Sequence, residues 1–327
     1  SMVDGALGEP LGRLYVEQYF SKRAKKKMNE LVNNVTAAYR ERIKNLEWMS
    51  ILTKKKALIK LNAIVRKIGY PDKWRNYAKL AITRQSHLQN VINAEIFEFK
   101  RTMAKLGKAV DRTEWFMSPP TVNAYYSVNI NEIVFPAGIL QPPYFSEHFD
   151  DALNYGAIGA VIGHELTHGF DDQGSHFDEK GSMRNWWTKQ DRKKFEKKSD
   201  VIIKQFNAYT AVDNLHVNGK LTLGENIADL GGLAIAYDAL KMALKNKKIK
   251  LIDGFTPEQR FFIGFAIGER GVYRLEALRQ RVLADPHSPP KFRVNGSVSN
   301  LMEFYEAFGV KKGDALYRSE GKRAKIW

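Results

Sequence analysis

The middle of the chain, residues 161–172, reads VIGHELTHGFDD. On an α-helix, residues four apart lie one above the other on the same face. His164 and His168 can therefore point their imidazole rings at one metal ion, and zinc accepts nitrogen and oxygen ligands of this kind. Glu165 would lie beside that ion, where its carboxylate can accept a proton from water. The stretch predicts a metal site that carries its own general base.

The residues before the motif separate this interpretation from a chance match, which a pattern of three fixed residues also allows. Residues 151–170 are almost wholly small or apolar up to the histidines. A helix that is apolar all round is a buried helix. Two histidines and a glutamate at its end would be costly to bury without partners. A bound metal removes that cost, so the context favours a metal site.

The composition is that of an ordinary globular protein, with 44% hydrophobic and 27% charged residues among 327. A chain of this length buries a large core and holds between one and three domains. No stretch reaches the length of an apolar membrane span. Cysteine is absent, so a metal must use His and carboxylate ligands. A bacterial cell envelope, periplasmic or secreted location and a cytoplasmic one both stay open.

The net charge of +16, from 52 Lys and Arg against 36 Asp and Glu, raises the alternative of nucleic-acid binding. The basic residues, however, cluster at 22–27, 54–56 and 192–198, beside apolar residues at helical spacing. This arrangement is typical of the solvated face of a helix. The sequence contains no zinc-finger, RNP-like or Gly-rich phosphate motif. We therefore expect attraction to acidic peptides or an acidic partner, and no nucleic acid.

The first hundred residues are predicted to be helical. A short helix opens near Leu14, and a second follows Ser21 as its N-cap and runs through Ile43. A third is predicted from a Thr53 cap through Ile68, ended by Gly69. A fourth spans residues 86–108.

The residue pattern changes near residues 109–120, where we place the boundary between a helical N-terminal part and the catalytic part. Residues 122–136 carry β-branched and aromatic runs around an Asn-rich turn, which predicts a β-hairpin or edge strands. Further helices are predicted at 191–210, 227–244 and 261–283.

The third metal ligand must come from outside the first motif, because catalytic zinc commonly takes three protein ligands plus water. Residues 224–232 read GENIADLGG. Glu225 and Asp229 are again four apart on one helical face. Glu225 would supply a carboxylate ligand, and Asp229 would accept the free ring N–H of a ligating histidine and fix its tautomer. Such spacing is also common on exposed helices, but the flanking apolar residues argue against exposure.

These motifs resemble those of the neprilysin-like zinc metallopeptidases, and particularly their bacterial oligopeptidase O type. Five stretches match in order: VNAYY at 122–126, IVFPAGILQPP at 133–143, VIGHELTHGFDD at 161–172, GENIAD at 224–229 and HSP at 287–289. The resemblance runs from about Leu11 to the C-terminus. Members of that family are longer, so the chain is similar to their C-terminal half. Residues 1–110 would belong partly to the capping lobe and linker, and residues 111–327 would form the catalytic domain. The rest of the capping lobe is an expected partner.

The resemblance implies a mainly α fold with a small β-sheet (α+β), of the thermolysin-like zincin type. It implies one zinc ion per chain, with these roles: His164, His168 and Glu225 as ligands, Glu165 as general base, Asp229 as the partner of His164, and His287 and Arg293 as the groups that stabilise the oxyanion.

The resemblance also implies a peptide-binding side of the site. Asn123, Ala124 and Tyr125 match the edge-strand region that holds the substrate backbone, and an edge strand is suited to adding an extended peptide. Three residues match apolar positions of the pocket for the residue after the cut: Ile139, Tyr144 and Val161. Glu269 stands where the family usually has a tryptophan near that pocket. It could bind an Arg or Lys of the substrate, or it could be a simple surface substitution.

The expected function is that of a zinc-dependent endopeptidase or oligopeptidase that hydrolyses short peptides, with Glu165 moving the proton. The alternative from a different class is a non-catalytic zinc-bound scaffold or peptide-binding fragment. The presence of Glu165 between the two histidines argues against that alternative.

Overall fold

The computed structural model describes residues 2–327. The fold is mostly helical with small sheets, which confirms the expected class. The helices are α1 (Met2–Tyr19), α2 (Lys22–Asn45), α3 (Ile51–Asn62), α4 (His87–Met103), α5 (Asp151–Asn154), α6 (Ala160–His168), α7 (Lys189–Asn207), α8 (Leu223–Leu244), α9 (Pro257–Gly268), α10 (Leu275–Ala284), α11 (Pro290–Val298) and α12 (Met302–Phe308). The strands are β1 (Val65–Gly69), β2 (Tyr125–Ser127), β3 (Glu132–Pro136), β4 (Thr210–Val212) and β5 (Leu215–His216).

The helices α2 and α3 begin at serine caps. The predicted cap at Ser21 is confirmed, since its hydroxyl accepts a hydrogen bond from the Ala24 N–H at 2.9 Å. The predicted Thr53 cap is wrong, because α3 begins after Ser50, and Thr53 is instead buried within the helix. The predicted continuation of this helix through Ile68 is also wrong. The chain leaves the helix after Asn62 and forms β1, where β-branched residues pair with a buried strand.

Three strands form the main sheet in the order β1-β3-β2. The predicted hairpin is confirmed: β2 runs antiparallel to β3, with Tyr126 opposite Ile133. β1 pairs in parallel on the other side of β3, with Val65 opposite Glu132. All of β3 is buried. The segment around Asn123 therefore leads into a strand at the edge of the sheet.

The helix predicted across residues 261–283 is wrong, because the structure contains two helices there. α9 ends at Gly268 and α10 begins at Leu275. Residues 270–274 between them are exposed and pack against no buried element that would hold them in a helix. The break matters for the site, because it leaves Glu269 as the residue that caps α9.

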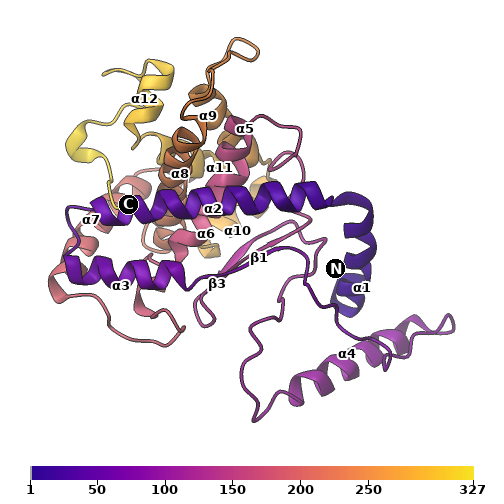
Figure 1. Cartoon of the computed structure of the whole chain (residues 1–327). Coiled ribbons are helices and arrows are strands. Elements are labelled where there is room, and N and C mark those ends of the chain that lie inside the picture. The colour runs from indigo at the N-terminus through magenta and orange to yellow at the C-terminus, as the bar shows by residue number, and fades with distance from the viewer. Residues whose placement is uncertain (1) are drawn as a thin grey trace.

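The core surrounds α6 and α8, which pack against each other at the centre of the molecule. The long helix α2 packs across both (Figure 1). The following residues of α2 are fully or almost fully buried: Met28, Val32, Val35, Tyr39 and Ile43. The helix that carries the histidines thus packs against α8 and against the buried face of α2.

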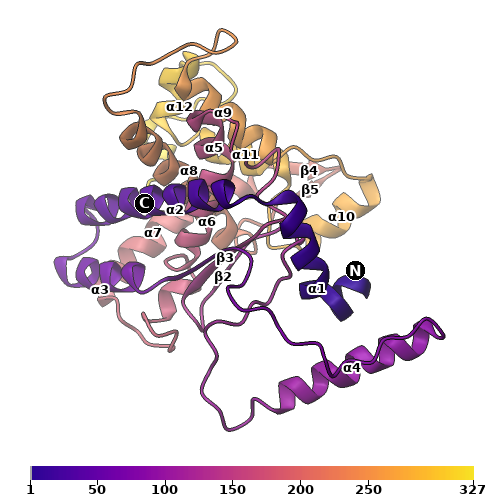
Figure 2. The same ribbon diagram turned by 45° about the vertical axis from the view of Figure 1, so that its right-hand side comes forward.

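α4 lies apart from this core and projects away from it in both views (Figures 1 and 2). It packs against α1. Its apolar face is exposed and consists of Leu88, Ile92, Ile96, Phe99 and Met103.

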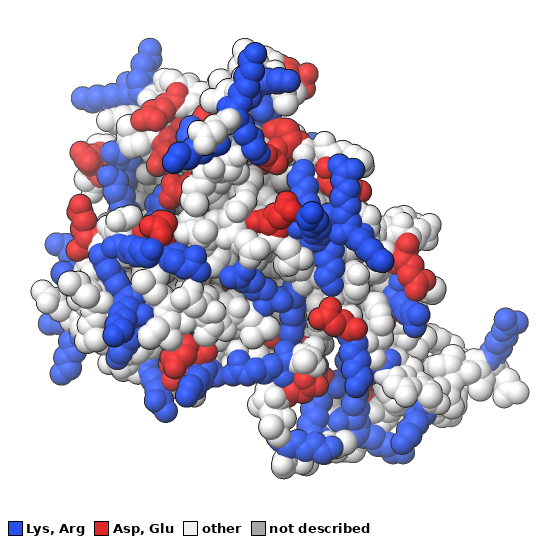
Figure 3. Space-filling view, viewed as in Figure 1, with Lys and Arg blue, Asp and Glu red and all other residues white. Residues whose placement is uncertain are grey.

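The surface carries the positive charge without one dominant basic patch on the face shown in Figure 3. Lys and Arg side chains are spread over that face and interspersed with Asp and Glu. Among the described residues, no helix is long and apolar enough to cross a membrane.

Candidate active site

Two glycines let α6 and α8 approach closely enough to share a site. A Cβ placed on Gly163 of α6 would lie 2.5 Å from the carbonyl oxygen of Gly232 in α8. A Cβ on Gly232 would lie 2.4 Å from the backbone nitrogen of His164. Both distances are far below van der Waals contact, so larger residues would push the helices apart. The close crossing brings Glu225, near the start of α8, to the histidines of α6.

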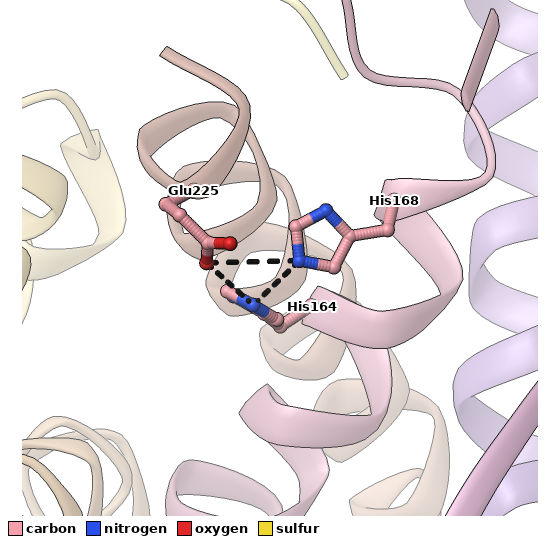
Figure 4. Close-up of side chains that lie close together, drawn as sticks. All are labelled: His164, His168 and Glu225. Carbon is pink, nitrogen blue, oxygen red and sulfur yellow. Dashed lines mark hydrogen bonds and ion pairs between the residues drawn. The ribbon is translucent and has the colours of Figure 1, made fainter. Parts of the chain in front are cut away.

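His164, His168 and Glu225 point toward one another (Figure 4), and their ligand atoms all lie within 4.8 Å of one another. The Nε2 atoms of the two histidines are 2.9 Å apart. Glu225 Oε2 lies 3.2 Å from Nε2 of His164 and 3.7 Å from that of His168. Tetrahedral zinc with nitrogen ligands at its usual bond length separates neighbouring donors by about 3.3 Å. The triangle has the size of a zinc site.

The chemistry of the donors also fits a cation. Glu225 Oε2 is buried and accepts no hydrogen bond within the described chain. The two imidazole Nε2 atoms face each other, while their Nδ1 atoms are held by carboxylates. A shared positive ion would satisfy all three inward lone pairs at once. One zinc ion per chain is the cofactor that these residues fit.

Each histidine is oriented by an aspartate. His164 Nδ1 lies 2.8 Å from Asp229 Oδ1, the pairing expected from the sequence. His168 Nδ1 lies 2.7 Å from Asp171 Oδ2. Such carboxylates fix the tautomer so that Nε2 is free for the metal. The sequence analysis missed Asp171, although its position three residues after His168, just beyond the helix end, was a usable signal.

The carboxylates of the site differ in their affinity for protons. Burial raises the pKa of Glu165 above that of an exposed glutamate. Burial opposes ionisation of Asp229, but Arg293 and His164 outweigh it and lower its pKa to about 2. Glu225 follows the same pattern, since the two imidazoles beside it hold its pKa well below the ordinary range. Asp229 and Glu225 therefore favour the charged form, whereas Glu165 binds a proton more readily than an exposed glutamate does.

A single cavity of about 720 Å³ contains all the residues that the sequence analysis assigned to the site. Its lining includes Asn123, Ala124, Tyr125, Ile139, Tyr144, Val161, His164, Glu165, His168, Glu225, Asp229, Glu269, His287 and Arg293. The Glu165 carboxylate makes no hydrogen bond with the described chain, so both of its oxygens are available to a molecule in the cavity. The roles assigned to these residues stay predictions.

The groups expected to stabilise an oxyanion are held by acidic partners. Arg293 of α11 donates from Nε and Nη2 to Asp229 at 2.7 and 2.6 Å. His287 keeps its Nε2 at 3.3 Å from Glu225, while its Nδ1 lies 2.8 Å from Asp285. Its side chain is 41% exposed, so it lies at the mouth of the cavity.

A buried lysine outside the motifs, Lys60, binds the loop that follows α6. Lys60 of α3 is 1% exposed. Its Nζ donates to the carbonyl oxygens of Gly169, Gly174 and Phe177 at 2.6, 2.7 and 2.7 Å. These residues bracket the loop that carries Asp171, so Lys60 ties that loop to the N-terminal helices. The sequence offered no signal for it, since Lys60 looks like one more exposed lysine of a basic helix.

Comparisons with known proteins agree with this geometry. The profile of peptidase family M13 matches residues 123–324, and a second profile of the same family matches residues 1–71. An endothelin-converting enzyme homolog of Locusta migratoria is 40% identical over 96% of this chain and 44% of its own length. Human neprilysin is 39% identical over 99% of this chain and 45% of its own length.

Solved structures give the same result. The zinc metalloprotease Zmp1 of Mycobacterium tuberculosis, in complex with an inhibitor, superposes with a TM-score of 0.93 and is 48% identical. PepO of Lactobacillus rhamnosis superposes with a TM-score of 0.88 and is 36% identical. Both alignments cover 99% of this chain and 50% of the other. The chain thus spans about half the length of the relatives it matches. The resemblance seen in the sequence is confirmed, and the chain belongs to peptidase family M13.

Proposed function

We propose that this chain is the catalytic part of a zinc-dependent endopeptidase or oligopeptidase that hydrolyses short peptides. The observation that carries the proposal is the Glu165 carboxylate, which makes no hydrogen bond with the described residues and lines the same cavity as a donor triangle of zinc size. When bound, zinc supplies Lewis-acid activation of water and of the scissile carbonyl. Residues 111–327 would form the catalytic domain.

The residues of the chain divide the remaining work. Glu165 accepts the proton of the attacking water and delivers it to the leaving amine. His287 and Arg293 donate to the oxygen that becomes negative in the transition state. Asp229 holds both Arg293 and His164, so one carboxylate sets the position of two groups.

The substrate backbone would lie along β2. This strand is at the edge of the sheet and lines the cavity through Tyr125 and Tyr126. An extended peptide can add to the free N–H and C=O groups of such an edge. Ala124 and Asn123 precede the strand, and the Asn123 side chain accepts the Ala124 N–H at 2.9 Å. Ala124 would then offer its carbonyl to the peptide, with Asn123 beside it.

The test is Glu165→Gln, compared with Glu306→Gln on the exposed surface of α12 as the matched control. We expect Glu165→Gln to retain about one zinc per chain while kcat falls by a factor of about 10² or more, since the change removes the general base. The control should keep both zinc and activity. Cleavage is read by mass spectrometry of short peptides. Wild-type rates in Glu165→Gln would refute the role of Glu165.

We further propose that the capping lobe expected from the resemblance is the partner of this part, and that the exposed apolar face of α4 contributes to their contact. An apolar patch of this kind commonly marks an interaction surface. Adding the capping lobe of a relative in trans should raise kcat/KM for peptides, and Phe99→Asp in α4 should weaken that effect. An effect that Phe99→Asp leaves unchanged would contradict the role of α4.

A further inference from the structure

Glu269 lies on the wall of the cavity and not on the outer surface. It caps α9, and its side chain is 14% exposed. A Cβ on the preceding Gly268 would lie 3.3 Å from the ring of Tyr144, so that ring packs directly beside the end of α9. Phe265, one turn earlier on α9, lines the same cavity. An acidic group is thus set into a largely apolar and aromatic wall.

The carboxylate of Glu269 is poorly satisfied where it lies. Its contact within the described chain is an ion pair with Arg293 Nη1 at 3.4 Å, and no side-chain or backbone donor forms a hydrogen bond with it. Burial raises its pKa, which reports the cost of keeping this carboxylate charged there. A partly buried carboxylate with few hydrogen bonds is stabilised strongly when a ligand supplies a hydrogen-bond donor.

Arg293 does not cancel the charge of Glu269, because Arg293 is already matched. It donates two short hydrogen bonds to Asp229, the fork-like geometry in which Arg–carboxylate pairs are strongest. Arg293 therefore supplies one positive charge for two carboxylates, Asp229 and Glu269. Glu269 is left with the longer contact to Arg293 as its one cationic contact among the described residues.

We propose, building on the proposed peptidase function, that Glu269 and the cavity wall around it form a subsite that selects a Lys or Arg side chain of the peptide. The aliphatic stem of such a side chain would pack against Ile139, Val161 and Phe265, while its cationic end meets Glu269. Long basic side chains combine these two needs, since the stem is apolar and only the head is charged. Of the two interpretations that the sequence left open, the buried position of Glu269 favours substrate binding over a surface substitution.

The test compares peptides that differ at one residue, Lys against norleucine and Arg against citrulline, so that the aliphatic stem is kept and the charge is removed. Their binding is measured by calorimetry on the zinc-loaded Glu165→Gln chain, which does not depend on cleavage. We expect the charged member of each pair to bind about tenfold more tightly, the scale of one charge-assisted hydrogen bond. Adding Glu269→Gln should bring each ratio close to one without loss of zinc. Glu306→Gln serves as the control and should leave the ratios unchanged.

Equal binding of the charged and neutral peptides to the chain with native Glu269 would overturn the proposal, whatever the variant does. So would a preference that survives Glu269→Gln, or binding that weakens equally for every peptide, which would mean that Glu269 acts only through Arg293. A failure of the proposed peptidase function would give a different result: the native chain would cleave no peptide, although the binding preference for basic side chains is present.

Discussion

Replacement of Lys60 by methionine tests how the N-terminal helices support the metal site. Methionine keeps the approximate length of the buried stem and removes three hydrogen bonds to carbonyl oxygens. The Gly174 oxygen keeps the Phe177 N–H at 3.0 Å, and the Phe177 oxygen keeps Trp186 Nε1 at 3.0 Å. The Gly169 oxygen keeps no other hydrogen bond among the described residues.

The expected loss of stability follows from these contacts. Leaving a buried carbonyl without its donor costs about 1–3 kcal/mol, and hydrogen bonds from a charged donor are worth about 1.5–3 kcal/mol each. The substitution also removes the cost of burying an ammonium group, so the net loss of stability lies below the sum of these values. We expect the free energy of unfolding to fall by about 3 kcal/mol. Zinc affinity should fall as well, because the released loop carries Asp171.

Urea denaturation followed by circular dichroism measures this change as a shift of the midpoint at constant slope. Lys55→Met is the matched control, since Lys55 lies exposed on the same helix. Its effect should stay within about 0.5 kcal/mol. A loss below about 1 kcal/mol in Lys60→Met, or one no larger than in the control, would refute the view that Lys60 holds this loop.

Three further predictions follow from the same contacts. Asp171→Asn should weaken zinc binding about tenfold or more, because His168 loses the carboxylate that orients its ring. A chelator competition measures the affinity for zinc, and a change below about twofold would exclude an orienting role for Asp171. Gly232→Ala should lower the free energy of unfolding, measured by urea denaturation, by about 2 kcal/mol, because its Cβ would clash with the backbone nitrogen of His164. Gly321→Ala is the control and should change it little, because the space around Gly321 is open. Burial lowers the pKa of Lys60 from 10.5 to about 7. Between these values the unfolded chain binds the extra proton, so stability should rise with pH, by up to about 1.4 kcal/mol per unit, and this rise should be missing in Lys60→Met.

The sequence by itself predicted the candidate ligands in two pairs, because helical geometry is local, and the family resemblance joined the two pairs into one site. His164 and His168 share a face wherever a helix forms, and so do Glu225 and Asp229. The apolar residues around both pairs indicated that both helices are buried. The hairpin before them was predictable in the same way, since its β-branched and aromatic runs and its Asn-rich turn depend on near neighbours only.

The tertiary structure decided what depends on distant partners. Residues 65–69 became a strand because β3, far along the chain, offered a parallel edge, and no local pattern contains that information. Lys60 looks like a surface lysine until the loop after α6 wraps its carbonyls around it. The position of Glu269 on the cavity wall depends on where α9 ends, and the pairing of Arg293 with Asp229 depends on how α11 packs against α8. A side chain's chemistry can be read from the sequence, but the groups that surround it are fixed by packing between elements far apart in the chain.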